Sequence, residues 1–546
     1  MPTAASTRSA WSASRGPFPR PARAPHPDGL AAVYRRRNPT ATSLYPIVQH
    51  HLETFLADAA EADPRGEGMP GWVERDFRAY LRCGILAHGF ARIRCDACAA
   101  ERLVAFSCKG RGVCPSCSAR RMVEVAAHLT DHVLPPLPLR QWVLSLPKRL
   151  RPFLPCDPHL AGAVLHVLLR AIRTTLQRTS PGAGPDAQLG AVSFLHRFGS
   201  ALNPHFHFHV VVTDGLFSEG DDGAVTFHEA THLAADDVLR LQRTIQLRVL
   251  RLFRRRGLLD GDTVADMLTW QASGGFSLDA SVRVHETDAT GRERLLRYCA
   301  RPPFAEGRLR IERHTSGTAT AAAARPDNAG VRQVLYHPAR PTPDGRTIIA
   351  LSPLEFLAAI SRLIPPPRVH RHRYHGVLAP SAALRARVVA LGRHDDEDPP
   401  AGTADTAGTS PDGAGPDGNA MPHPPAAPQL ESPAPHRPDS PQRTAARSRW
   451  ARLLARIYEV FPLLCPGCGA EMRILAFITA AEPVDVILRH LGLPAAPPPL
   501  SPARGPPQHD LGFDAVHSPD IDQTPTFDPT EPEPVPDFDF DQSRGA

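Results

Sequence analysis

The chain has 546 residues, enough for two or three domains, and its sixty prolines and ten cysteines are clustered rather than evenly spread. Its formal charge of +6 combines an arginine-rich body with an acidic stretch from Asp510 onward, which favours a nucleic-acid partner. Without an apolar run near the ~20 residues of a membrane span, or the apolar segment of a secretion signal, the sequence argues against a membrane or secreted protein. We expect a cytoplasmic protein whose cysteines bind metal rather than form disulfides.

Composition and hydrophobic periodicity divide the chain into six segments. They are a disordered basic arm (1–43), a zinc-binding, DNA-binding domain (44–134), an α+β domain (135–394), a disordered linker (395–447), a small module with one C-x-x-C (448–493) and a disordered acidic tail (494–546).

Two C-x-x-C pairs lie in the N-terminal domain, with fifteen residues between them. They are formed by Cys95 and Cys98, and by Cys114 and Cys117. Each tight turn offers two thiolates, and the spacing between the pairs is that of a structural zinc site. We therefore predict that these four cysteines share one Zn²⁺.

Further potential ligands flank these pairs. Cys83, His88 and Cys108 lie close by in sequence, and His128 and His132 are four residues apart on a following predicted helix. These residues form either a second zinc site or ordinary core thiols beside a solvated helix face. The segment is also basic, and residues such as Lys109 and Arg111 are either phosphate contacts held by a zinc module or a merely soluble surface.

The next segment predicts an α+β fold in which an antiparallel sheet is flanked by helices. Predicted strands are 141–146, 191–196, the histidine-rich stretch near 205–212, 224–227 as a hairpin return, and 275–284. One predicted helix begins at Asp157-Pro158 and another near Asp237. In the stretch 275–284, alternation predicts that Phe276, Leu278, Ala280, Val282 and Val284 face inward.

The stretch from Asn203 to Val212 alternates strictly between histidine and apolar residues. Because side chains alternate faces along a strand, Phe206, Phe208, Val210 and Val212 are predicted to face a core. His205, His207 and His209 share the other face. Same-face neighbours are about 6.6 Å apart along a strand, close enough for imidazoles to converge on one metal. The alternative is a polar, solvated strand face.

Two further stretches carry potential DNA-binding groups. The segment 292–301 predicts a short helix ended by Pro302, on which Arg294 and Arg301 share the face of Tyr298. This arrangement suits a phosphate beside the phenol, although packing is the commoner role of such a tyrosine. The basic run 368–374 includes Arg371, Arg373 and Tyr374, which suggests either a strip that binds a nucleic-acid backbone or a solvated loop.

A helix containing Trp450 is predicted near the C-terminal end, followed by a lone pair, Cys465 and Cys468, a strand and another helix. One C-x-x-C is half of a zinc site. The missing ligands could come from His490, from another chain, or from nowhere.

Taken together, these stretches resemble the rolling-circle transposases of the HUH class, in the insertion sequence 91 family. The motifs occur in the family's order: 106–117 with its cysteines, 199–215 with the histidine strand, 297–303 around Tyr298, and 371–376. The resemblance covers residues 44–391 and resumes at 450–493. It identifies His207 and His209 as the metal-binding pair, His205 as an additional ligand or neighbour, and Tyr298 as the nucleophile.

The resemblance implies an HUH endonuclease that nicks and rejoins single-stranded DNA at element ends and target, through a 5′-phosphotyrosine. It implies structural Zn²⁺ and a catalytic Mg²⁺ or Mn²⁺, with DNA contacts from Lys109, Arg111, Arg294, Arg301, Arg371, Arg373 and Tyr374. Arg294 occupies the position of a second tyrosine in two-tyrosine members, so the chain resembles the single-tyrosine branch. Cleavage and strand transfer would then alternate either by repeated use of Tyr298 or between the protomers of a homo-oligomer. A nucleoid-associated location follows. A single-tyrosine relaxase or replication initiator, a non-catalytic zinc-dependent DNA-binding regulator and a small-molecule metalloenzyme are the rival functions.

Overall fold

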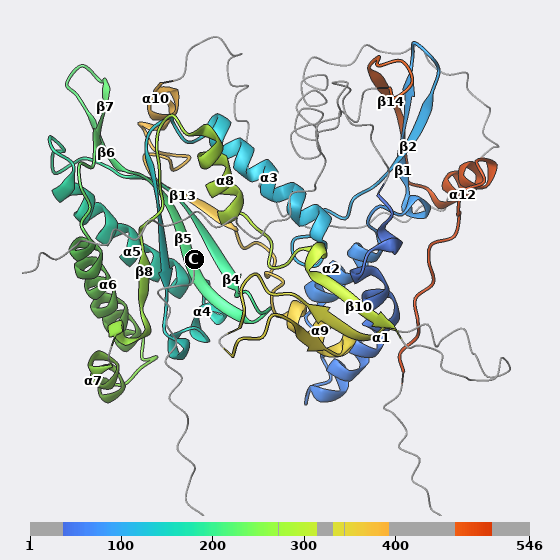
Figure 1. Cartoon of the computed structure of the whole chain (residues 1–546), viewed down its shortest axis with the longest axis horizontal. Coiled ribbons are helices and arrows are strands. Elements are labelled where there is room, and N and C mark those ends of the chain that lie inside the picture. Colours follow the sequence, from blue (N-terminus) through green and yellow to red (C-terminus); the bar gives the residue numbers. More distant parts are fainter. Residues whose placement is uncertain (1–36, 271, 314–330, 343, 393–464, 505–546) are drawn as a thin grey trace, which may run out of the picture.

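The computed structural model describes residues 37–270, 272–313, 331–342, 344–392 and 465–504, which fold into three regions (Figure 1). The predicted linker, nearly all of the basic arm, most of the acidic tail and the helix around Trp450 lie outside the described residues. Within the described part, the strands form antiparallel sheets flanked by helices, so the expected α+β class is confirmed. No described helix is both long and apolar enough to cross a bilayer.

The largest region is built on one sheet with the strand order β13-β4-β5-β3-β8, and β9 also pairs with β3. Its strands are β3 (Leu139–Ser145), β4 (Gly190–Phe198), β5 (Pro204–Thr213), β8 (Ser277–Asp279), β9 (Arg283–Val284) and β13 (His372–Gly376). The hairpin β6 (Gly215–Glu219) and β7 (Val225–Glu229) continues from β5, as predicted. The predicted strand 275–284 is broken between Asp279 and Arg283, and Val282, expected to face inward, is 37% exposed there.

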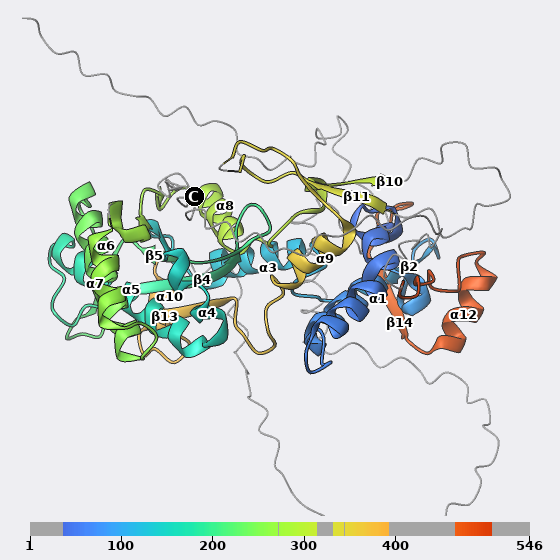
Figure 2. The ribbon, with the colours of Figure 1, turned by 90° about the horizontal axis from the view of Figure 1, so that it is seen from below.

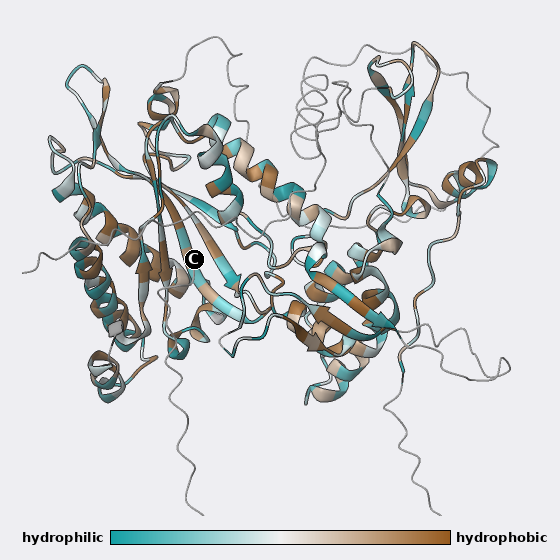
Figure 3. Ribbon diagram, in the orientation of Figure 1, coloured by the Kyte–Doolittle hydropathy of each residue, from teal (hydrophilic) through white to brown (hydrophobic). Residues whose placement is uncertain are grey.

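Helices cover both faces of this sheet (Figures 1 and 2). One face bears α4 (Phe153–Cys156), α5 (Pro158–Thr179), α6 (Ala235–Arg255) and α7 (Gly261–Thr269). The other bears α3 (Pro115–His132), α8 (Ala289–Cys299) and α10 (Arg385–Ala390). The long helix α6 presents its apolar side to the sheet and its charged side to solvent (Figure 3). As predicted, Phe206, Phe208, Val210 and Val212 lie in the core beneath α5 and α6.

The second region contains the first helices of the chain and a segment from much later in the sequence. Its elements are α1 (Leu44–Ala62), α2 (Gly71–Arg82), β10 (Leu309–Arg313), β11 (Val331–Tyr336), β12 (Ile349–Leu351) and α9 (Pro353–Ser361). Their apolar side chains share one core, so the described residues between Phe304 and Ile364 pack on α1 and α2 rather than extending the large sheet. Ser352 and Glu355 form a capping box at the start of α9.

The third region joins both ends of the described chain (Figure 1). The hairpin β1 (Phe90–Cys95) and β2 (Glu101–Ala105) receives β14 (Met472–Ile478) on the free side of β1, and α12 (Ala481–His490) covers one end. Beyond α12, residues 491–504 run back to α1, where Gln49 donates to the carbonyl of Pro499 and Thr54 accepts the amide of Arg504. This part of the expected disordered tail is therefore held against the N-terminal helix. Short 3-10 turns, η1 (Pro39–Ala41), η2 (Leu86–His88), η3 (Lys148–Leu150), η4 (Ala272–Gly275) and η5 (Glu306–Arg308), complete the described elements.

Candidate metal centre and nucleic-acid interface

Three histidines from two neighbouring strands converge on one face of the large sheet. His207 and His209 lie on β5, and His196 lies opposite His207 on β4. Each can offer one ring nitrogen to a common point, since these nitrogens all lie within 4.8 Å of one another. The centroids of the His196 and His209 rings are 4.3 Å apart, and those of His207 and His209 are 4.9 Å apart. This is a ligand set for a divalent ion.

Hydrogen bonds fix the orientation of each ring and leave one nitrogen free. His207 donates from Nδ1 to the carbonyl of His205 over 3.1 Å, and His196 donates from Nε2 to the carbonyl of Cys299 over 2.7 Å. His209 Nδ1 lies 2.8 Å from the side-chain amide nitrogen of Gln141. The remaining nitrogens, His196 Nδ1 and His209 Nε2, are buried without a hydrogen-bond partner. Unpartnered buried nitrogens that face one another fit a metal ion, which would satisfy them.

Burial keeps these rings in the state that binds metal. Removal from water lowers the pKa of His196 to about 3, helped by the positive charge of Arg301. The same cause, followed by the charge of His196, holds the pKa of His207 and of His209 well below the ordinary value. All three imidazoles are therefore neutral near pH 7, as a metal ligand must be.

The third ligand was not assigned from the sequence, where His205 was considered as the extra residue. In the structure the His205 ring lies tilted beside that of His207, with centroids 4.8 Å apart, but the converging group contains His196 instead. The available signal was the alternation of Val192, Phe194 and His196 on a predicted strand. That pattern places His196 on one face with two apolar residues but does not say which strand lies beside it.

Tyr298 lies over the histidine centre. Its ring meets that of His209 edge to face, with centroids 5.4 Å apart. The guanidinium of Arg301 sits 4.5 Å from the centroid of the Tyr298 ring, as the shared helix face predicted. Arg294, the other flanking arginine, is exposed one turn earlier on α8. The structure thus brings Tyr298 and Arg301 to the converging histidines and leaves Arg294 on the surface.

A basic cavity of about 880 Å³ adjoins this centre. His196 and Arg301 line it on one side, and Arg371, Arg373 and Tyr374 line it from β13 and the segment before it. The predicted basic strip is therefore in part an edge strand, since residues 372–376 pair with β4. Burial, followed by repulsion from Arg121 and Arg111, lowers the pKa of Arg371 to about 10, so its guanidinium is still charged near pH 7.

The zinc-binding region contributes cations to the same cavity. Arg111 and Arg121 line it, and Arg111 donates to the carbonyl of Val369. Arg121 in turn donates to the carbonyl of Lys109 over 2.9 Å, which ties the predicted DNA-binding loop to α3. Asp76 accepts the amides of Gly112 and Val113 at 3.1 and 2.8 Å and holds that loop on α2. The predicted cations from two regions of the chain thus meet at one opening.

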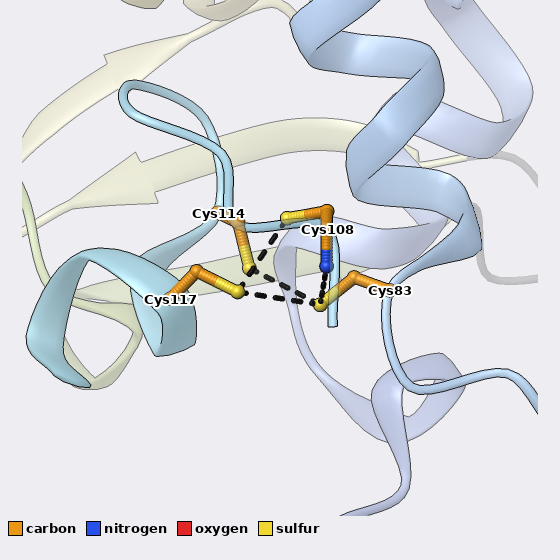
Figure 4. A group of neighbouring side chains, drawn as sticks. All are labelled: Cys83, Cys108, Cys114 and Cys117. Atoms are coloured by element: carbon orange, nitrogen blue, oxygen red, sulfur yellow. Dashed lines mark hydrogen bonds between the residues drawn. The ribbon is translucent and has the colours of Figure 1, made fainter. Parts of the chain in front are cut away.

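Four cysteines gather where α2, the loop and α3 meet (Figure 4). They are Cys83, Cys108, Cys114 and Cys117. The sulfur of Cys83 lies 3.6 Å from that of Cys117 and 3.7 Å from that of Cys114. Arg37 approaches the sulfurs of Cys83 and Cys114 to 3.8 and 4.0 Å, so a positive charge faces the group. Such a cluster fits a tetrahedral Zn²⁺ held by four thiolates, whose excess negative charge the guanidinium offsets.

The remaining pair, Cys95 and Cys98, lies instead with Cys465 and Cys468. The single site expected from the spacing of Cys95, Cys98, Cys114 and Cys117 is therefore not what the structure builds. The physical reason is that β1 and β2 carry the first pair away from α3, toward β14. Of the expected second group, Cys83 and Cys108 join the cluster shown in Figure 4, whereas His88 is exposed outside it. Three further candidate ligands belong to no potential metal-binding group among the described residues: His128, His132 and His490.

Two family models match the chain. One, described as "Transposase zinc-binding domain", covers residues 47–146, and the other, described as "Putative transposase", covers residues 190–386. No curated protein and no solved structure matches. The first match contains the six N-terminal cysteines, and the second contains the three converging histidines together with Tyr298. A zinc-binding domain of the insertion sequence 91 type precedes a transposase domain, and the chain therefore belongs to the insertion sequence 91 family of transposases.

Proposed function

We propose that this transposase nicks and rejoins single-stranded DNA by rolling-circle transposition, with Tyr298 as its nucleophile. The observation that carries this proposal is the edge-to-face contact, at 5.4 Å between centroids, of Tyr298 with one of three converging histidines. A phenol beside a divalent-ion site is the pairing that phosphoryl transfer to tyrosine requires.

His196, His207 and His209 would hold Mg²⁺ or Mn²⁺. The bound ion would polarise the scissile phosphate and stabilise negative charge on the leaving 3′ oxygen. The protein's own contribution is to keep the three rings neutral, through burial, and correctly oriented, through the acceptors on His205 and Cys299 and the amide of Gln141.

Tyr298 would attack phosphorus through its phenolic oxygen. A bond forms between that oxygen and phosphorus, and the bond from phosphorus to the 3′ oxygen breaks. The phenol loses its proton, and the leaving 3′ oxygen gains one, so a 3′-hydroxyl is released. The resulting 5′-phosphotyrosine stores the energy of the phosphodiester, so rejoining needs no nucleotide. Arg301, held over the Tyr298 ring, is placed to contact the phosphate during transfer. Since Arg294 stands where a second tyrosine would, Tyr298 acts twice or two protomers share the cycle.

The basic cavity is the proposed path of the single strand. Seven arginines line it, from both the zinc-binding region and the large sheet: Arg111, Arg121, Arg197, Arg301, Arg368, Arg371 and Arg373. A positively charged groove with an aromatic side chain, here Tyr374, is the arrangement that follows a single-stranded backbone and stacks on bases. A DNA substrate also implies that the protein works at the nucleoid in the cytoplasm.

The test is to incubate the full-length protein with a single-stranded element end and Mn²⁺ and to look for a covalent adduct by denaturing electrophoresis. We expect an adduct with the wild type and none with Tyr298→Phe, which keeps the ring but lacks the nucleophilic oxygen. His207→Ala should slow adduct formation by about 100-fold or more, since a metal ligand is lost.

Tyr374→Phe is the matched control, because Tyr374 also lines the cavity but is not placed as the nucleophile. It should form the adduct. An adduct that persists in Tyr298→Phe would remove Tyr298 from this role. Specific DNA binding by the wild type with no adduct in any strand or metal condition would instead favour a non-catalytic regulator.

A further inference from the structure

The pair Cys465 and Cys468 meets its partners at the other end of the chain. The sulfur of Cys468 lies 3.5 Å from that of Cys95, and the sulfur of Cys465 lies 3.4 Å from that of Cys98. All four sulfurs lie within 4.8 Å of one another. Sulfurs around a tetrahedral zinc with bonds of about 2.3 Å are roughly 3.8 Å apart, whereas a disulfide brings them to about 2.05 Å. The separations therefore fit a shared ion.

The two pairs are presented by the same kind of turn. The amide of Cys95 donates to the carbonyl of Ala100 over 2.8 Å, and the amide of Cys465 donates to the carbonyl of Ala470 over the same distance. In each turn, the residue just after the second cysteine has a left-handed backbone, with φ of 58° at Ala99 and 74° at Gly469. Two equivalent turns facing each other offer four thiols in a tetrahedral arrangement, as in zinc ribbons.

Strand pairing, a small core and an ion pair join the two turns in addition to the facing sulfurs. β14 pairs with β1 so that Met472 lies opposite Cys95, and Met472 and Ile93 share a small core with the buried cysteines Cys95 and Cys465. Arg473 and Asp96 form an ion pair at 3.2 Å across the same junction. At the far end of β1, Val484 and Leu488 of α12 pack on Leu86 and Phe90. The cysteines thus lie in a preformed junction rather than on a free surface.

We propose that Cys95, Cys98, Cys465 and Cys468 form a second structural zinc site, which locks residues 465–504 onto the N-terminal region. Thiolate ligands select zinc, and binding it would release the thiol protons. Cys95 and Cys98 lie within the zinc-binding match at residues 47–146, whereas Cys465 and Cys468 lie beyond both matches, so the pairing of these two turns is not assigned by either. It is also independent of the chemistry proposed for Tyr298.

The site would close a long loop, since Cys98 and Cys465 are 367 residues apart in sequence. A cross-link across so many residues restricts the unfolded chain strongly. The zinc would therefore act on the whole chain, fixing the last described segment to β1, whereas the cluster around Cys83 acts locally within the N-terminal domain.

The test is the number of zinc ions bound by the reduced, full-length chain, measured by native mass spectrometry with His207→Ala/His209→Ala in every protein, so that the converging histidines add no ion to the count. We expect two. The double variants Cys95→Ser/Cys98→Ser and Cys465→Ser/Cys468→Ser should each bind one, and the quadruple variant should also bind one, because the two pairs serve the same ion. Two ions in either double variant would overturn the proposal. One ion in each double variant but none in the quadruple variant would also overturn it, because the two pairs would then serve different ions. A single ion in the chain with all its cysteines, unchanged in every variant, would overturn it as well.

Two controls separate loss of a ligand from loss of the fold. Arg473→Ala breaks the ion pair across the junction but no zinc ligand, so it should still bind two ions. Cys468→His keeps a ligand at an exposed position, so with Co²⁺ in place of zinc it should bind two ions and shift the visible absorption of one. An unshifted cobalt spectrum in a folded Cys468→His variant would contradict a role for Cys468. None of these results depends on whether the DNA adduct forms.

Discussion

At the scale of single residues, a side chain outside the converging group contacts one of the three histidines. Gln141 on β3 is buried, lies 2.8 Å from His209 Nδ1, and donates to the sulfur of Cys299 over 3.4 Å. The amide nitrogen of Gln141 faces Nδ1. An imidazole that binds metal through Nε2 keeps its proton on Nδ1, and the Gln141 amide turned by 180° would present its oxygen as the acceptor for that proton. Gln141 therefore links a metal ligand to the helix that carries Tyr298.

Gln141→Leu should keep the buried volume but lose this orientation. We expect Mn²⁺ affinity to fall by about 10- to 100-fold, the range seen when a partner of a metal-binding histidine is removed. Isothermal titration with Mn²⁺ measures it, and Gln141→Glu, which retains an acceptor, should bind more tightly than Gln141→Leu. Equal affinities in the wild type and Gln141→Leu would show that β5 alone orients His209.

A buried histidine of α1 should make stability depend on pH. Burial, followed by the positive charges of Arg504 and His50, lowers the pKa of His51 to about 4. Between pH 6.5 and 4 the unfolded chain binds a proton at this residue and the folded chain does not, so the free energy of unfolding falls as pH falls. The slope from one such group is at most about 1.4 kcal/mol per pH unit.

His51→Phe removes the titrating group and keeps a ring in the core. The melting temperature of this variant should fall less between pH 6.5 and 5 than that of the wild type, as measured by circular dichroism. His232→Phe, a change at an exposed histidine, serves as the control and should leave the pH dependence unaltered. A parallel fall in both variants and the wild type would assign the acid sensitivity to other groups.

At the scale of elements, β5 is anchored at its end by a buried carboxylate. Asp214, which is 1% exposed, follows β5 and pairs with Arg140 of β3 at 2.8 Å and with Arg283 of β9 at 2.6 Å. These ion pairs tie the end of β5 to β3 and β9, in the register that places His207 and His209 on the α8 side. The turn signal at Asp214-Gly215 was visible in the sequence, but its two arginine partners lie on other strands.

Asp214→Asn should leave Arg140 without its charged partner in a largely buried position. Breaking such a pair lowers the free energy of unfolding by about 3 to 5 kcal/mol. Urea denaturation measures this loss, and Asp221→Asn, at an exposed turn of the following hairpin, should change it by less than about 0.5 kcal/mol. A loss for Asp214→Asn as small as that of the control would contradict an anchoring role.

The elements show what a sequence reveals and what it does not. Strict alternation was enough to place His207 and His209 on one face of β5, because that pattern is local. It could not supply His196, since the register of β4 against β5 is set by packing in three dimensions. The same limit applies to the cysteines: each turn is encoded locally, but which turns face each other is decided by the pairing of β1 with β14.

At the scale of the whole molecule, the regions do not follow the order of the sequence. The described residues between Phe304 and Ile364 pack on α1 and α2, and β14 completes the sheet begun by β1 and β2. The sequence predicts the strand and the helix that became β14 and α12, but places them in a separate module at residues 448–493. Long-range pairings leave no periodic signal in one sequence, which is why the sheet membership of β10 and β14 emerged only from the structure.

The pairing of β14 with β1 has a consequence for how the protein is made. On a ribosome, β1 is complete at Cys95, but its partner β14 is complete only at Ile478. At roughly 5 to 20 residues per second, synthesis of the intervening chain takes on the order of 20 to 75 s. During that time one edge of β1 is unpaired and open to wrong partners, while the large sheet with the histidine centre has all its strands by residue 376. The large sheet with its histidine centre can therefore form before the N-terminal sheet, which is complete only after β14 has been synthesised.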